Sequence, residues 1–222
     1  MRRMGNVYPG IPQSIVLELA RIQGATILVE TGTFLGATAQ WAAAHFDRVH
    51  TIERSEQLYQ QAHVGLAHLT NVTQHLGSSR EILPRIVQDF GAERAVYWLD
   101  AHWSGGATAG EDDECPVLGE LASLSIRTED IILIDDARLF LCAPPPPHDP
   151  AAWPTIADIL QAAPKSSFVQ IVDDVIFIVP AGNAPLKKRL IEHAQERSTV
   201  SGAGGSPLKT RVKELLKRAG VR

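Results

Sequence analysis

Several features that would indicate other classes of protein are missing from this chain. Its 222 residues include two cysteines, Cys115 and Cys142, too few for a disulfide framework or a zinc cluster, so both are expected to be reduced thiols. No apolar run reaches the roughly 18 to 20 residues that a membrane span needs. The first residues are not followed by a secretory core. We therefore expect a cytoplasmic protein with no membrane partner.

A strong charge of one sign is also missing. The formal net charge is −4, and charged residues make up 21% of the chain. Such a balance leaves no electrostatic footprint for a nucleic-acid backbone, and the basic stretch 209–222 is interpreted as a solvated helix face. With 45% hydrophobic residues, the composition is typical of a globular domain. We therefore expect a small-molecule partner and no nucleic acid.

Short apolar runs alternate with amphipathic segments of helical length, a pattern typical of a parallel sheet covered on both faces. The sequence predicts strands over 26–30, 48–53, 72–76, 95–99 and 130–134. Two further strands, 167–172 and 175–179, lie close on either side of Asp173-Asp174 and predict a terminal hairpin. The predicted fold is α/β, with a Rossmann-like, doubly wound, seven-stranded sheet, parallel except for one antiparallel terminal strand, and helices on both faces.

The remaining segments predict helices and one surface connection. Helices are expected over 13–22, 37–45, 56–69, 79–89, 116–125 and 155–162. The four prolines of 144–147 exclude regular structure there. The polar, helical segment from residue 185 is interrupted at 201–206 by a stretch with the composition of a flexible linker. We expect a catalytic domain over 1–182 and a helical, partly flexible extension over 183–222.

The most informative segment is 28–36, where an apolar strand leads into an acid-x-Gly-x-x-x-Gly turn. Gly32 and Gly36 would let a ligand lie against the backbone, and Glu53, which ends the second strand, could accept both hydroxyls of a ribose. Glu30 would repel a pyrophosphate, but an acid suits a ligand that carries an ammonium group. These residues favour S-adenosylmethionine over NAD.

Polar residues follow the ends of five predicted strands: Glu30, Glu53, Gly77-Ser78, Asp100 and Asp135-Asp136. In an open parallel sheet, ligands collect beyond the carboxyl ends of the strands. Any one of these residues has an ordinary alternative role, such as a helix cap or a solvated acid. Their convergence from five segments predicts a single binding site at this edge.

The ordered set of motifs resembles the class I S-adenosylmethionine-dependent methyltransferases, especially their small O-methyltransferase-like branch. The resemblance covers about residues 12 to 180, in the motifs Glu30-Thr31-Gly32-Thr33-Phe34-Leu35-Gly36, Thr51-Ile52-Glu53, Gly77-Ser78-Ser79, Trp98-Leu99-Asp100-Ala101-His102 and Ile134-Asp135-Asp136. It implies that Glu30 lies near the methionine ammonium, Glu53 at the ribose and Gly77-Ser78 at the adenine. The full set of implied cofactor-binding residues is Glu30, Gly32, Thr33, Phe34, Gly36, Glu53, Gly77, Ser78, Ser79 and Asp100.

The resemblance also implies a metal site. In metal-dependent O-methyltransferases, including those acting on sugars of macrolide and coumarin antibiotics, acids at the places of Asp100, Asp135 and Asp136 hold Mg²⁺. Three clustered carboxylates would raise one another's pKa unless a hard divalent cation neutralised them. Such an ion would lower the pKa of an acceptor hydroxyl. Alternatively, Asp136 caps the segment from Ala137, and Asp100 only touches the cofactor.

His102 follows Asp100 by two residues, where the sugar-modifying relatives commonly carry an acid that can serve as a base. An imidazole with a pKa of about 6.5 could take a proton from a hydroxyl at neutral pH. Three roles stay open: general base, fourth metal ligand, or hydrogen-bonded loop histidine. The loop 104–114 is either a mobile cover or an ordinary linker. Its acids, Asp112-Asp113-Glu114, are interpreted as caps of the helix at Pro116.

The leading hypothesis is methyl transfer from S-adenosylmethionine to a hydroxyl of a small polar acceptor, a sugar or another natural-product-like diol, with Mg²⁺ assistance. His102 and Asp100 are the candidate catalytic residues. One alternative is an S-adenosylmethionine-binding enzyme with other chemistry, and another is a catalytically inactive nucleoside-binding or interaction module. The chain lacks a nucleophile-elbow motif, which argues against a hydrolase. A homodimer through the terminal helices is also left open.

Overall fold

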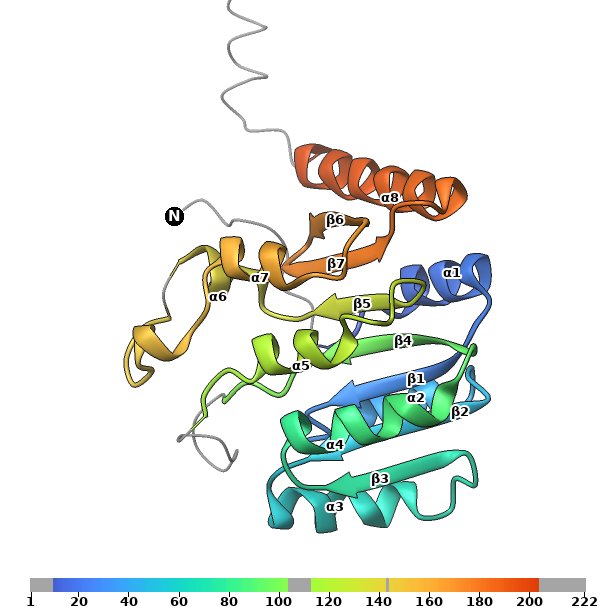
Figure 1. Cartoon of the computed structure of the whole chain (residues 1–222), viewed down its shortest axis with the longest axis vertical. Helices are drawn as coiled ribbons and strands as arrows, with labels where there is room; N and C mark the ends of the chain where they lie inside the picture. Colours follow the sequence, from blue (N-terminus) through green and yellow to red (C-terminus); the bar gives the residue numbers. More distant parts are fainter. Residues whose placement is uncertain (1–9, 104–112, 143, 204–222) are drawn as a thin grey trace, which may run out of the picture.

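The computed structural model describes residues 10–103, 113–142 and 144–203, with side chains up to residue 198. Its strands are β1 (Ala25–Thr31), β2 (Arg48–Glu53), β3 (Val72–Leu76), β4 (Arg94–Leu99), β5 (Ile131–Ile134), β6 (Ser167–Val172) and β7 (Val175–Pro180). They form one seven-stranded sheet in the order β3-β2-β1-β4-β5-β7-β6 (Figure 1). Strands β1 to β5 pair in parallel, and β7 runs antiparallel to β5 and β6. The predicted fold class is confirmed.

Helices cover both faces of this sheet (Figure 1). They are α1 (Gln13–Gln23), α2 (Ala37–Ala43), α3 (Glu56–Leu66), α4 (Ser79–Ile86), α5 (Val117–Leu124), α6 (Ala137–Leu141), α7 (Ile156–Ala162) and α8 (Ala184–Ala203). The core on one face takes its helical residues from α1, α2, α3 and α8, and the core on the other takes them from α4 to α7. Short 3-10 turns lie at Val87–Phe90 and Pro150–Ala152.

The central strands are apolar on both sides because each face has its own core. Along β4, Tyr97 and Leu99 belong to the core under α4 and α5, whereas Trp98 belongs to the core under α1 and α8. Strands buried on both faces give continuous apolar runs rather than an alternating pattern. Because helices cover both faces, the strand ends are the place where a ligand is expected to bind.

The helices differ from the predictions mainly at their ends. Thr155 lies outside α7 because it forms a capping box with Asp158. Helix α8 continues to Ala203, into the predicted linker, and Leu186 and Leu190 are fully buried in the core with α1. The start of the predicted extension thus packs on the domain, and a division of the chain at residue 182 stays a prediction. None of the helices in the described ranges has the length and hydropathy needed to cross a membrane.

Candidate functional site

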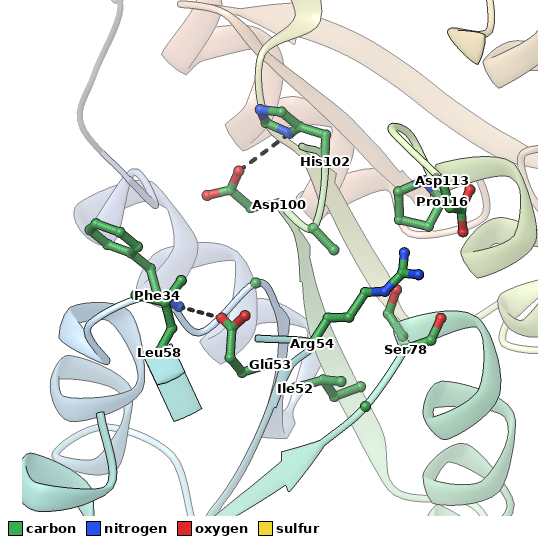
Figure 2. A pocket seen from close by; sticks show the side chains of 14 residues that line it. Phe34, Ile52, Glu53, Arg54, Leu58, Ser78, Asp100, His102, Asp113 and Pro116 are labelled. Carbon is green, nitrogen blue, oxygen red and sulfur yellow. Dashed lines mark hydrogen bonds and ion pairs between the residues drawn. The ribbon is translucent and has the colours of Figure 1, made fainter. Parts of the chain in front are cut away.

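A cavity of about 290 Å³ lies at the carboxyl ends of β1 to β4 (Figure 2). Seven of the predicted cofactor-binding residues line it: Gly32, Phe34, Glu53, Gly77, Ser78, Ser79 and Asp100. His102, the candidate base, lines it as well. Three predicted residues do not: Glu30, Thr33 and Gly36. The remaining lining residues are not among the predicted ones: Ile52, Arg54, Leu58, Ala101, Asp113 and Pro116.

Glu53 ends β2, and its side chain points into the cavity (Figure 2). Its carboxylate accepts the backbone N–H groups of Phe34 at 2.9 Å and Ser55 at 2.8 Å, which hold it in a buried position. Phe34 has a left-handed backbone with φ 49°, a costly conformation for a bulky residue that is characteristic of functional sites. Because each carboxylate oxygen has two lone pairs, Glu53 can still accept hydroxyl groups of a ligand.

The glycines of the turn are required by protein contacts. A Cβ on Gly32 would lie 2.3 Å from the carbonyl oxygen of Asp100, and one on Gly36 would lie 3.2 Å from the Leu66 side chain. Both glycines also have positive φ, at +86° and +82°. Protein contacts alone therefore account for both glycines, and the expectation that they leave room for a ligand stays a prediction. The space beside Gly32 is filled by the end of β4, which brings Asp100 against the turn.

Glu30 lies beneath this turn. It is 2% exposed, and its Oε2 accepts the Thr51 hydroxyl at 2.7 Å, while Thr51 and Thr33 share a hydroxyl contact of 2.6 Å. Burial raises the pKa of Glu30 to about 7, although hydrogen bonds from Thr51 and Thr38 oppose the shift. Glu30 thus supports the turn through Thr51 and Thr33, and its predicted contact with an ammonium group stays a prediction.

His102 lies between two of the acids. Its Nε2 is 3.0 Å from Asp136 Oδ2, its Nδ1 is 3.5 Å from Asp100 Oδ1, and its side chain is 10% exposed. Burial alone would lower the pKa of His102, but the hydrogen bond to Asp136 and the charges of the acids outweigh it and raise the pKa. Burial raises the pKa of Asp100, which the His102 charge opposes. The imidazole is therefore held by carboxylates at both nitrogens.

The same contacts decide how well a metal would fit. Asp136 Oδ1 accepts from Arg138 at 2.5 Å, so both of its oxygens already have nitrogen donors, and Asp135 Oδ1 accepts the Asp136 N–H at 2.8 Å. Within residues 10–103, 113–142 and 144–203, no three His, Cys, Asp or Glu side chains are arranged to hold a metal ion. The predicted magnesium site at Asp100, Asp135 and Asp136 does not fit this arrangement. Here an imidazole and a guanidinium accompany the acids.

A buried glutamate, Glu114, holds the loop behind His102. Glu114 accepts Trp153 Nε1–H at 2.8 Å and the Asp149 N–H at 3.0 Å, and lies 3.1 Å from His148 Nδ1. The Trp153 ring lies 5.6 Å from the His102 ring, measured between centroids. Glu114 thereby fixes the 148–153 loop, and Trp153 of this loop packs against His102.

The interpretation of these loop acids as helix caps is wrong for the two that the structure describes. Glu114 binds the 148–153 loop, and Asp113 pairs with Arg80 at 2.8 Å. Pro116 occupies the N-cap position of α5. Asp112 and most of the predicted cover, 104–112, lie outside the described residues. The acids therefore connect loops around the site.

Glu120, on α5, was missed entirely. It is 1% exposed, and its Oε1 has no hydrogen-bond partner among the described residues. Burial raises the pKa of Glu120, while hydrogen bonds from Ser79 and Thr31 oppose the shift. The available signal was a single charged residue in the largely apolar segment 117–124. Glu120 lies next to Ser79 and so supports the floor of the cavity.

Comparisons with known proteins agree with this fold. No family model matches the sequence, and no curated protein does. A candidate caffeoyl-CoA O-methyltransferase from Staphylococcus aureus is similar in structure, with a TM-score of 0.52 and 16% identity over 79% of this chain and 86% of that chain. The O-methyltransferase TomG from Streptomyces achromogenes, involved in tomaymycin synthesis and solved with S-adenosylmethionine, gives 0.47 and 19% over 78% and 82%. The chain has the Rossmann-like fold of small O-methyltransferases, as the resemblance predicted.

Proposed function

We propose that this protein transfers a methyl group from S-adenosylmethionine to a hydroxyl of a small polar acceptor, such as a sugar or another vicinal diol. The observation that carries the proposal is one cavity lined by Glu53 from the end of β2 and by Asp100 and His102 from the end of β4. This cavity lies at the carboxyl edge of the sheet, where ligands of such folds bind. A polar nucleoside and a proton acceptor can meet there.

The lining residues fit the cofactor. Glu53 would accept the ribose hydroxyls, beside the apolar side chains of Ile52 and Leu58, and the segment 77–79 would border the adenine. Glu30, Thr33 and Gly36 would contribute by shaping the turn. When bound, S-adenosylmethionine supplies an electrophilic methyl group on a sulfonium.

The chemistry assigned to the chain's own residues is proton transfer and orientation. His102 Nε2–H donates to Asp136, which leaves Nδ1, on the side of the cavity-lining Asp100, as the proton acceptor. In this assignment His102 takes the proton of the acceptor hydroxyl, and Asp100 stabilises the imidazolium that results. The Trp153 ring packs against His102 and keeps the imidazole in place.

Magnesium assistance, which the family resemblance implies, is no part of this mechanism, because both oxygens of Asp136 already accept from His102 and Arg138. Its test is direct. Turnover would be measured after EDTA treatment and again after Mg²⁺ is added back. A strict requirement for Mg²⁺ would contradict the role given to His102 and restore the metal site.

The proposal is tested by calorimetry followed by turnover. We expect heat on titration with S-adenosylmethionine and with S-adenosylhomocysteine, and release of S-adenosylhomocysteine with acceptors from a panel of 3,4-dihydroxybenzoate and methyl glycosides. No heat with either nucleoside would refute the cofactor. Binding without methyl transfer to any panel member would favour the alternatives, an enzyme with other chemistry or an inactive binding module.

A further inference from the structure

Helix α6 begins directly after β5, with Asp136 at its N-cap position. An aspartate at this position usually accepts a backbone N–H from the first helical turn. In the described part of the chain, the Asp136 side chain makes no cap hydrogen bond, and its backbone is left-handed, with φ 56°. Its carboxylate contacts His102 and Arg138 instead. Another residue must therefore satisfy the first N–H groups of α6.

That residue is Asp174, in the tight turn between β6 and β7. Its main-chain carbonyl oxygen accepts the Ala137 N–H at 2.8 Å, and its Oδ1 accepts the Arg138 N–H at 2.8 Å. Its Oδ2 pairs with the Arg138 guanidinium, and its side chain is 8% exposed. Asp174 thus caps α6 from a different part of the chain.

We propose that Asp174 is a positioning residue for methyl transfer. By capping α6 in place of Asp136, it leaves the Asp136 carboxylate available to orient His102. The inference rests on the proposed function, because His102 is assigned as the proton acceptor there. Once the Asp174 side chain is lost, Asp136 is already at the N-cap position, and capping would draw its carboxylate away from His102.

The turn itself provides a matched control. Asp173 and Asp174 both have left-handed backbones, with φ 47° and 72°, a conformation that glycine adopts without strain. Their side chains act on different elements, since Asp173 pairs with Arg197 of α8 and Asp174 with the start of α6. Replacing either residue by glycine therefore removes one side-chain contact and leaves the turn compatible with its backbone.

The experiment compares Asp174→Gly with Asp173→Gly. We expect Asp174→Gly to lower kcat by roughly tenfold or more, less than the roughly 10⁴-fold typical when an acid that orients a catalytic histidine is itself replaced. The affinity for S-adenosylmethionine and the KM for the best acceptor of the panel should stay within about twofold. Asp173→Gly should keep kcat. Asp174→Asn, which retains an Oδ1 acceptor for the cap, should keep most of it.

A crystal structure of Asp174→Gly with S-adenosylhomocysteine gives a readout that needs no acceptor. Asp136 is expected to leave His102 and accept a backbone N–H of α6. An Asp136 carboxylate still 3.0 Å from His102 Nε2 would overturn the inference, as would an equal loss of kcat in both glycine variants. If the unaltered protein methylates no panel member, the proposed function fails and this structure decides the inference alone. If Asp174→Gly does not fold, loss of the Asp136–His102 contact in Asp174→Asn would overturn it.

Discussion

Acids lie at both ends of the paired strands β4 and β5, buried at the amino ends and partly buried at the carboxyl ends, and their hydrogen-bond partners differ. At the amino ends, Asp130 accepts the Ala95 N–H at 3.2 Å, the Tyr97 hydroxyl at 3.1 Å and Arg127 Nε at 2.6 Å. Burial raises the pKa of Asp130, and the Arg127 guanidinium opposes the shift. One acid meets one arginine, a phenol and a backbone N–H, so this network is closed.

At the carboxyl ends, three acids share fewer cations. Asp100, Asp135 and Asp136 lie close to His102 and Arg138, and burial together with the neighbouring Asp136 raises the pKa of Asp135 to about 6. Burial would also raise the pKa of Asp136, but the hydrogen bond and charge of His102 lower it. The acids at this end can therefore still bind protons, and Asp100 and His102 line the cavity.

A buried acid is therefore not by itself a sign of function. Groups with shifted pKa values occur in structural networks as well as at active sites. What distinguishes the carboxyl end is an excess of acids over cations beside an open space. Changes at this end should alter activity with little loss of stability, and changes at the amino end should do the reverse.

The largest effect is expected from His102→Gln. Loss of a general base typically lowers kcat by about 10²- to 10⁴-fold, and the affinity for S-adenosylmethionine should hardly change. Because the pKa of His102 is raised, the rate of the unaltered protein should increase with pH through that pKa, and the variant should lose this dependence. Steady-state kinetics across pH measure both. His68→Gln, at an exposed position in the turn after α3, is the control, and an equal loss there would contradict the assignment.

The counterpart at the amino end is Asp130→Ala. Removing one partner of a buried ion pair leaves Arg127 uncompensated, so we expect a loss of about 3 to 5 kcal/mol in the free energy of unfolding. Urea denaturation measures this loss. The kcat of the folded fraction should be unchanged, since the site lies at the other end of the strands. A drop in kcat as large as that of His102→Gln would remove the distinction between the two ends.

A pH dependence of stability is expected from Glu30, at the carboxyl end of β1. Its folded pKa of about 7 lies above the ordinary 4.5, so the stability it contributes is complete below about pH 4.5 and is lost as the pH rises through about 7. The difference is on the order of 3 kcal/mol. Glu30→Gln should remove it, so the variant should be the more stable protein at pH 8. The free energy of unfolding would be measured for both proteins at pH 5 and pH 8. An equal change between the two pH values in both proteins would contradict the shift.

The smallest effect compares two acids that line the cavity. Glu53→Gln removes the charge assigned to the ribose hydroxyls, and hydrogen bonds to charged groups are worth about 1.5 to 3 kcal/mol, so the affinity for S-adenosylmethionine should fall roughly 10- to 100-fold. Asp113→Asn removes only a partly exposed pair with Arg80 and should have little effect. Calorimetry measures both affinities. Equal losses would mean that Glu53 has no special place in the site.

Much of the fold could be predicted from local patterns. The predicted strands 48–53, 72–76 and 167–172 coincide with β2, β3 and β6, because apolar, β-branched runs bounded by turn residues are a local property of the chain. Glu53, Asp100 and His102 were found by the rule that polar residues after parallel strands share one edge. Their convergence followed from strand direction alone.

Local patterns did not reveal the partner of each acid. The resemblance implied that Asp135 and Asp136 join Asp100 around a metal, but Arg138 and His102 contact the oxygens of Asp136. Glu114 was interpreted as a helix cap, although its donors come from the 148–153 loop. In each case the competing donor comes from outside the motif, and no local periodicity records it.

Local patterns along the chain set the order of helices and strands, and the parallel direction of the strands then brings the acids to one edge. The partner of each acid depends instead on packing: Asp136 meets His102 and Arg138, and Asp174 meets the start of α6. A hydrogen bond forms only within about 3.5 Å. Residues far apart in the sequence reach that distance only when the whole sheet and its helices are packed.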